Sequence, residues 1–277
     1  MTALLAPVHS IDASDPKHLS RALEDLGEGL ASWRLAWALA RLDLRNRYRG
    51  SVIGPFWMTL STAVMLVGLG FLYARLFGMT LQGYLPHLAV SLITWNVISA
   101  VVTDACTSLT SAEGVIRQLR LPYTVHALRC VFRNLLTAAH SLPLILLVFL
   151  ALDQWPGAEA VLAIPGLLLL AINALSVSLF LGMLCARFRD IGPIVGSVMQ
   201  LAFFMTPVIW KPELAGDWQP WLVLNPFYAL LETVRGPLVE GGGPPVAWLA
   251  AFLYTALAAA GAFAFFVRFR GRVAFWV

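Results

Sequence analysis

The feature that most constrains this chain is a series of long apolar runs that contain no Asp, Glu, Lys or Arg. A helix needs about 20 mainly apolar residues to cross a hydrocarbon core of about 30 Å, because it rises about 1.5 Å per residue. Six runs meet this requirement, and they are 56–74, 85–103, 134–152, 160–186, 191–210 and 246–267. The sequence therefore predicts an all-α integral membrane protein with six transmembrane helices, the third beginning near Pro122.

Composition supports the membrane class and argues against a nucleic-acid partner. The 277 residues are 59% hydrophobic and 12% charged, whereas soluble domains are roughly 25% charged. The net charge is +4, but the basic residues lie between apolar runs and form no groove lined by stacking aromatics. We expect anionic membrane lipid, and no nucleic acid, to be their partner.

The distribution of basic residues predicts the orientation. An even number of spans puts both termini on one side, and loops rich in Lys and Arg face the cytoplasm. With the N-terminus inside, only Arg75, Lys211 and Arg235 of the 19 Lys and Arg residues lie outside. The first twenty residues also lack the basic and apolar regions of a cleaved signal. Both termini are therefore expected in the cytoplasm.

Residues 29–50, ahead of the first span, have the pattern of an amphipathic helix at the membrane interface. Its apolar residues recur every three or four positions and are Leu30, Trp33, Trp37, Ala40, Leu44 and Tyr48. Residues 1–28 are expected to form a cytoplasmic tail, to which no function is assigned. Residues 51–277 are expected to form the six-span domain.

Four arginines flank or follow this apolar face: Arg41, Arg45, Arg47 and Arg49. In one interpretation they hold anionic lipid, at about 1 kcal/mol per basic residue. In the other, some of them receive a pyrophosphate headgroup, because a guanidinium binds phosphate oxygens through two parallel hydrogen bonds. Both interpretations stay open.

A cytoplasmic segment of about residues 106–121 joins the second and third spans. Glu113 precedes Arg117 by four positions, a spacing that favours an ion pair within a short helix. This segment, which also contains Gly114 and Arg120, either docks on a partner protein or only connects two spans.

The region of about residues 212–238, after the fifth span, is polar at its edges and apolar in the middle. Pro220 and Pro226 interrupt helices, so we predict two short re-entrant helices in the outer leaflet. An interfacial loop with a Trp and Tyr belt is the alternative. The candidate residues of an outer gate are Trp218, Trp221, Asn225, Pro226, Phe227, Tyr228 and Arg235.

Aromatic residues within the spans also have two interpretations. They form a belt at the membrane interface, or they line a channel whose flat apolar walls let a glycan slide. The channel candidates are Trp57, Tyr73, Trp95, Phe203, Phe204 and Trp210.

Several motifs that carry chemistry are missing. The chain has no G-x-x-x-x-G-K-[ST] phosphate loop, and its predicted spans have no carboxylate of the kind that marks an ion relay. His140 is interpreted as a hydrogen-bonded packing residue, with a relay as the alternative. The spacing of the three cysteines fits neither a zinc site nor a redox pair. We expect no catalytic residue, metal or cofactor, and an energy source in a separate polypeptide.

Three segments resemble those of ABC-type polysaccharide-export permeases, the family that exports O-antigen, capsule and teichoic-acid chains. They are RYRGSVIGPFWMTLSTAVMLVGLGFLYARLFG, AEGVIRQLRLPYTVHALRCVFRNLLTAAH and MTPVIWKPELAGDWQPWLVLNPFYALLETVRGPL. Together they cover most of residues 47–238, including the pair Asn225-Pro226. The first is most similar to O-antigen exporters.

The resemblance implies a homodimer in the bacterial inner membrane, with each permease paired to a nucleotide-binding subunit that binds ATP and magnesium. This subunit would contact the coupling helix around Glu113 to Arg120. The implied cargo is a polysaccharide on undecaprenyl pyrophosphate, exported to the periplasm for lipopolysaccharide biosynthesis. A capsule or teichoic-acid exporter and a drug or lipid exporter are alternatives. A membrane enzyme acting on a lipid carrier is disfavoured because the sequence offers no convincing cluster of His, Asp or Glu. An ion-coupled carrier is disfavoured because the predicted spans contain no carboxylate.

Overall fold

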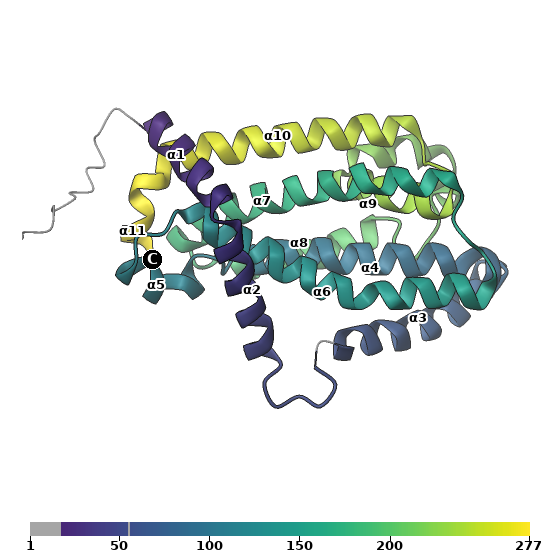
Figure 1. Ribbon diagram of the computed structural model, residues 1–277. Helices are drawn as coiled ribbons and strands as arrows, with labels where there is room; N and C mark the ends of the chain where they lie inside the picture. Colours follow the sequence, from purple (N-terminus) through teal and green to yellow (C-terminus); the bar gives the residue numbers. More distant parts are fainter. Residues whose placement is uncertain (1–17, 55) are drawn as a thin grey trace, which may run out of the picture.

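The computed structural model describes residues 18–54 and 56–277, and this part of the chain contains helices and no strand. Five helices are long and apolar enough to cross a membrane, and they run alongside one another (Figure 1). They are α3 (Phe56–Leu76), α4 (Leu81–Ala105), α6 (Tyr123–Leu152), α7 (Ala163–Arg187) and α10 (Pro245–Phe269). As expected, α6 begins directly after Pro122.

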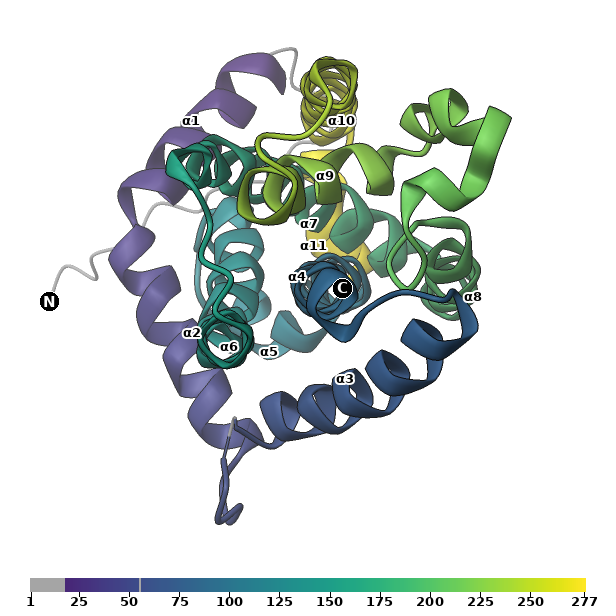
Figure 2. The same cartoon turned by 90° about the vertical axis from the view of Figure 1, so that its right-hand side faces the viewer.

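Helix α4 lies at the centre of the bundle, with α3, α6, α7, α8 and α9 around it (Figure 2). Its side chains Leu88, Leu92 and Trp95 are buried in the largest apolar cluster. Helix α3 lies at the edge, where it packs on α4 and α6, and most of its apolar side chains are exposed. The bundle therefore offers a wide apolar surface to lipid or to another protein.

The fifth predicted span, 191–210, differs from the expectation. Helix α8 (Ile191–Met205) has 15 residues, which at about 1.5 Å per residue gives about 22 Å, less than the hydrocarbon thickness. The helix ends because Pro207 restricts the preceding residue to extended conformations, and Thr206 has φ −93° and ψ 136°. The chain continues through turns and bends as far as Trp210, so only five of the six predicted spans are helices of spanning length.

The N-terminal region forms two helices, α1 (His18–Ala31) and α2 (Trp33–Arg47), instead of a tail followed by one helix. The predicted division between residues 28 and 29 falls inside α1, and residues 1–17 lie outside the described part. Helix α2 crosses the spans at a steep angle near one end of the bundle (Figure 1). Only the narrow face formed by Ala36, Ala40 and Leu44 is buried, against α6.

Short elements close the two ends of the bundle. At the end near α2 are η1 (Thr110–Ala112), α5 (Glu113–Gln118), η4 (Arg270–Arg272) and α11 (Val273–Trp276). Near the other end are η2 (Ala158–Leu162), η3 (Pro212–Leu224) and α9 (Pro226–Val239). Helices α1 and α11 lie at the same end in Figure 1, so the described chain starts and finishes on one side of the bundle.

Candidate functional site

The segment predicted to couple to a partner forms η1 and α5 at the end of the bundle next to α11. Glu113 and Arg117 make the expected ion pair, with 2.7 Å between carboxylate and guanidinium. Arg117 also donates a hydrogen bond of 2.9 Å to the backbone oxygen of Val277. Gly114 and Arg120 are exposed, and the space around the Gly114 Cα is open. The helix thus has an accessible face of about one and a half turns.

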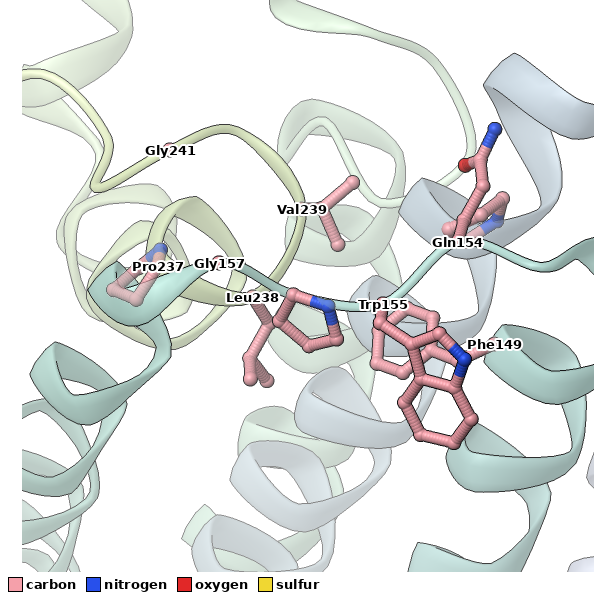
Figure 3. A pocket seen from close by; sticks show the side chains of 10 residues that line it. Phe149, Gln154, Trp155, Gly157, Pro237, Leu238, Val239 and Gly241 are labelled. Atoms are coloured by element: carbon pink, nitrogen blue, oxygen red, sulfur yellow. The ribbon is translucent and has the colours of Figure 1, made fainter.

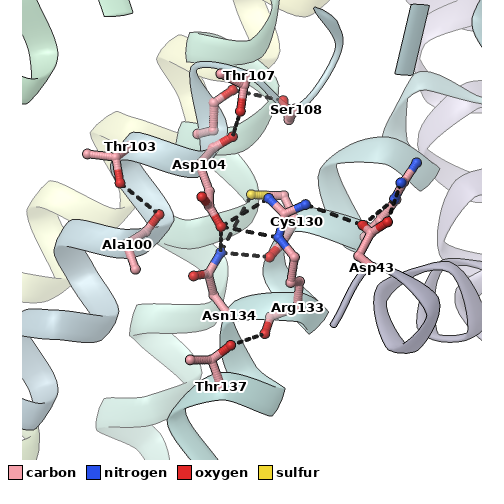
Figure 4. A network of polar contacts seen from close by, with 12 residues as sticks. Asp43, Ala100, Thr103, Asp104, Thr107, Ser108, Cys130, Arg133, Asn134 and Thr137 are labelled. Atoms are coloured by element: carbon pink, nitrogen blue, oxygen red, sulfur yellow. Dashed lines mark hydrogen bonds and ion pairs between the residues drawn. The ribbon is translucent and has the colours of Figure 1, made fainter. Parts of the chain in front are cut away.

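An ion-pair network joins α2 to α4 and α6 at the same end (Figure 4). Asp43 accepts a hydrogen bond of 2.6 Å from Arg129 Nε and pairs with Arg133 at 3.3 Å. Arg133 also pairs with Asp104 at 3.0 Å. Two carboxylates from α2 and α4 therefore neutralise guanidinium groups that α6 carries into a half-buried position.

The four candidate headgroup arginines do not form one cluster. Arg47 lies 3.6 Å from the Asp104 carboxylate and so belongs to the ion-pair network. Arg41, Arg45 and Arg49 are exposed, and no carboxylate among the described residues pairs with them. These three are the ones whose charge is available to an external anion.

At the opposite end, a second polar cluster lies inside the protein. Arg235 of α9 is fully buried and pairs with Glu232 of the same helix. Its Nη1 donates hydrogen bonds of 3.2 Å to Ser91 Oγ of α4 and 2.6 Å to the carbonyl of Pro207. Its Nε lies 3.3 Å from the Glu240 carboxylate. Arg235 was expected at an outer gate, and its side chain instead fastens α9 to α4 and to the break after α8.

Glu240 follows α9 and is only partly enclosed. Its carboxylate lies 3.3 Å from His87 Nδ1 of α4. Burial alone would raise the pKa of this carboxyl, but the hydrogen bond with His87 and the charge of Arg235 outweigh it and lower the pKa to about 2. Glu240 therefore stays ionised at neutral pH and balances the arginine.

The structure adds two buried histidines to the one singled out in the sequence. His87 in α4 and His126 in α6 are almost completely buried. His140 itself bonds through Nδ1 to the Leu136 carbonyl of its own helix at 2.6 Å and packs on the edge of Phe56. This agrees with a packing residue. His87 was missed because it lies near the end of the apolar run.

Asn225 and Pro226 have a clear structural reason to be adjacent. Asn225 is the N-cap of α9, and its Oδ1 accepts hydrogen bonds from the N–H groups of Phe227 and Tyr228 at 2.9 and 3.4 Å. Its Nδ2 donates to Thr206 Oγ1 at 2.9 Å. Pro226 occupies the first helical position, where its fixed φ suits the helix. The pair therefore starts α9 and ties it to the break in α8.

The remaining aromatic candidates separate into buried and exposed groups. Trp95 was a channel candidate, but it is 4% exposed and packs against Phe203 and Phe227 in the core. Tyr228 is also buried. The exposed candidates are Trp57, Phe204, Trp218 and Trp221, and the half-buried ones are Tyr73, Phe203, Trp210 and Phe227. Among the candidates in a single copy of the chain, the exposed group offers the most aromatic surface to a channel or a lipid interface.

A small pocket opens at the end of the bundle near α9 (Figure 3). It has a volume of about 120 Å³ and lies between the loop after α6, which carries Gln154 and Trp155, and the end of α9 with Val239 and Gly241. No group of three or more potential metal-ligating side chains occurs in the described ranges. The polar side chains described above therefore hold helices together at both ends of the bundle.

Comparison with known proteins agrees with this arrangement. A family model described as ABC-2 type transporter matches residues 34–239. The O-antigen export system permease protein RfbA of Myxococcus xanthus is 29% identical over 211 residues, which cover 73% of this chain and 79% of that protein. Two Klebsiella pneumoniae proteins of the same description are 22% and 21% identical over 204 and 201 residues, covering 72% of this chain and 78% of each.

The family match extends from α2 to the end of α9, so it includes the α5 segment, the break after α8 and, except for Glu240, both ion-pair networks. The resemblance inferred from the three sequence segments is confirmed at the level of the family. This chain belongs to the ABC-2 type transporter family.

Proposed function

We propose that this protein is the membrane permease of an ATP-driven exporter that moves a lipid-linked polysaccharide, O-antigen in the first place, from the cytoplasm to the periplasm. The observation that carries the proposal is the placement of α5. A short helix with an open face stands at the end of the bundle that carries most of the arginines, between two spans, where a partner can push on it. The names of the relatives support the choice of cargo.

The energy source lies in a separate nucleotide-binding subunit, which holds ATP and magnesium. This partner docks on α5 and contacts the exposed surface around Gly114, Arg117 and Arg120. Closure of the partner moves α5, and α4 and α6 follow because they flank it in the chain. The permease makes no covalent bond. It offers surfaces whose affinity for the cargo differs between two states.

Two copies of the permease form the path for the glycan. The edge helix α3 exposes a long apolar face, which suits contact with a second copy or with lipid. The glycan is carried on undecaprenyl pyrophosphate, whose anionic headgroup meets Arg41, Arg45 and Arg49 at the cytoplasmic surface. The exposed aromatics Trp218 and Trp221, on η3, stand at the outer mouth, and the region of η3 and α9 re-enters the outer leaflet there.

The proposal is tested by depleting the protein in its native bacterial cell. Lipid-linked glycan in the inner membrane is then compared with polysaccharide on the cell surface. Loss of surface polymer, with finished carrier-linked chains accumulating inside, supports polysaccharide export, and sugar analysis identifies the cargo. An unchanged surface without accumulation refutes it and favours export of a drug or lipid.

A further inference from the structure

Helix α1, in the region first taken as a tail, turns one face into the protein. Ala22, Asp25 and Gly29 are buried and are spaced by three and four positions. Asp25 is fully enclosed, whereas the two glutamates of the same helix, Glu24 and Glu28, are exposed. A buried carboxylate is costly unless it is paired and hydrogen-bonded, so its partners indicate what it does.

Asp25 caps the first turn of α6. Its Oδ2 accepts a hydrogen bond from the N–H of Tyr123 at 3.1 Å, and its Oδ1 accepts one from the N–H of Thr124 at 3.1 Å. Thr124 Oγ1 donates to the same Oδ1 at 2.9 Å. The first N–H groups of a helix have no partner within it, and the N-cap residue here, Pro122, provides no side-chain acceptor. A residue almost a hundred positions away does so instead.

The same carboxylate also holds the end of α10. Arg270 Nε donates to Asp25 Oδ2 at 2.8 Å, and its guanidinium stands over the ring of Tyr123, 5.8 Å from the centroid. One buried charge therefore joins α1, α6 and the segment after α10.

The fit between α1 and α6 is tight. A Cβ atom built on Gly29 would lie 2.4 Å from Thr124 Cβ, so the two helices approach as closely as only glycine permits. Lateral displacement of α1 would consequently break the contacts of Asp25 with the first turn of α6.

The coupling segment rests on this assembly. Leu109, before α5, is buried in one apolar cluster with Ala22 and Val273, and Ile116 of α5 packs against that cluster. Arg117 reaches the backbone of Val277. Helix α5 ends at Gln118, and α6 starts at Tyr123, so the capped turn is the first rigid structure that a moving α5 would pull.

We propose that Asp25 is a positioning residue for coupling, which keeps the first turn of α6 intact so that displacement of α5 reaches α6 and α10. Without this cap, fraying of the first turn would absorb the movement. The inference rests on the proposed function, because it requires a partner that drives α5.

The test uses the full chain assembled with its partner ATPase in lipid vesicles, with carrier-linked glycan as cargo. The variants are Asp25→Asn, which keeps the size and removes the charge, and Thr124→Val, which removes one hydrogen bond. Glu24→Gln and Glu28→Gln are the matched controls on the exposed face of α1. We expect Asp25→Asn to lower the glycan exported per ATP hydrolysed about fivefold or more, while complex yield and both controls match the wild type.

A purely structural residue would change complex yield and leave export per ATP in the assembled fraction unchanged. That result overturns the inference. If Asp25→Asn does not assemble, Thr124→Val decides through the same ratio, and an unchanged ratio overturns the inference. If the wild type exports no glycan, the proposed function fails instead. Spin labels on Gln118 and Gly27 then test the inference alone: a broader distance distribution in Asp25→Asn with bound nucleotide supports it, and an unchanged distribution overturns it.

Discussion

Asp43 and Arg129 join α2 to α6 through two parallel hydrogen bonds between carboxylate and guanidinium, one of them 2.6 Å long from Nε to Oδ2. Because Arg133 shares the same carboxylate, Asp43 holds two positive charges in place. This acidic side chain therefore holds α2 against α6 together with the buried face of Ala36, Ala40 and Leu44.

Replacing this carboxylate should loosen α2. Asp43→Asn leaves Arg129 and Arg133 half-buried with too little negative charge, and we expect a loss of about 2 kcal/mol in stability. Thermal unfolding of the protein in detergent measures the change. Asp190→Asn, at an exposed site, is the control, and equal melting temperatures for the two variants would contradict the assignment.

Removing the cap of α9 should have a smaller effect. Asn225→Ala loses the two hydrogen bonds to the first turn of α9 and the bond to Thr206, and caps of this kind contribute about 1 kcal/mol. We expect a lower melting temperature and faster hydrogen exchange in residues 227–230. Asn46→Ala, on the exposed part of α2, should leave both unchanged, and the prediction fails if both variants behave alike.

A methyl group at Gly166 should separate α7 from α9. A Cβ there would lie 2.3 Å from the carbonyl oxygen of Thr233, and overpacking of this kind costs about 1–3 kcal/mol. Gly166→Ala should therefore unfold at a lower temperature than the wild type. Gly196→Ala, where the space around the Cα is open, is the matched helical control and should be neutral or stabilising.

The ion-pair network of Arg235, Glu232 and Glu240 should make the stability of the protein depend on pH. The pKa of Glu240 is about 2 in the folded protein and 4.5 without its partners. A lowered pKa means that its contribution is complete above pH 4.5 and is lost as the pH falls toward about 2. Melting temperatures recorded over this range should decline less for Glu240→Gln than for the wild type. Glu213→Gln, at an exposed site, should follow the wild type.

Variants of Arg41, Arg45 and Arg49 discriminate between the two headgroup interpretations. Neutralising Arg41, Arg45 and Arg49 should weaken binding to anionic vesicles by about 1 kcal/mol per residue. If they also receive a pyrophosphate, binding of carrier-linked glycan should fall further than binding of plain anionic lipid. Arg75→Gln, in the last turn of α3 at the other end of the bundle, is the control, and equal losses for the two ligands would leave lipid anchoring as the explanation.

The sequence predicted most of the spans because a long apolar run without charged residues indicates by itself a helix that is shielded from water. Runs 56–74, 85–103 and 246–267 lie within α3, α4 and α10, and no tertiary information is needed to see them. The end of α8 could have been predicted locally, because a proline disfavours helical backbone angles in the residue before it, here Thr206. The predicted span 191–210 did not take Pro207 into account.

The ion-pair networks could not be predicted in the same way. Asp43 and Arg129 are 86 positions apart, and Asp25 and Tyr123 are 98 apart, so helical periodicity says nothing about either contact. In the sequence each aspartate is one polar residue on an amphipathic helix. Their importance follows only from the packing of α1 and α2 on α6, which brings each one to a specific partner.

The break after Met205 leaves a stretch of non-helical backbone inside the bundle. Its freed carbonyls at Pro207 and Ile209 accept hydrogen bonds from the side chains of Arg235 and Tyr84, so this backbone keeps its polar groups satisfied without a helical ladder. Side chains can exchange one acceptor for another at much lower cost than a helix can be stretched. We therefore expect the segment after α8 to change its length and tilt more easily than the continuous helices around it.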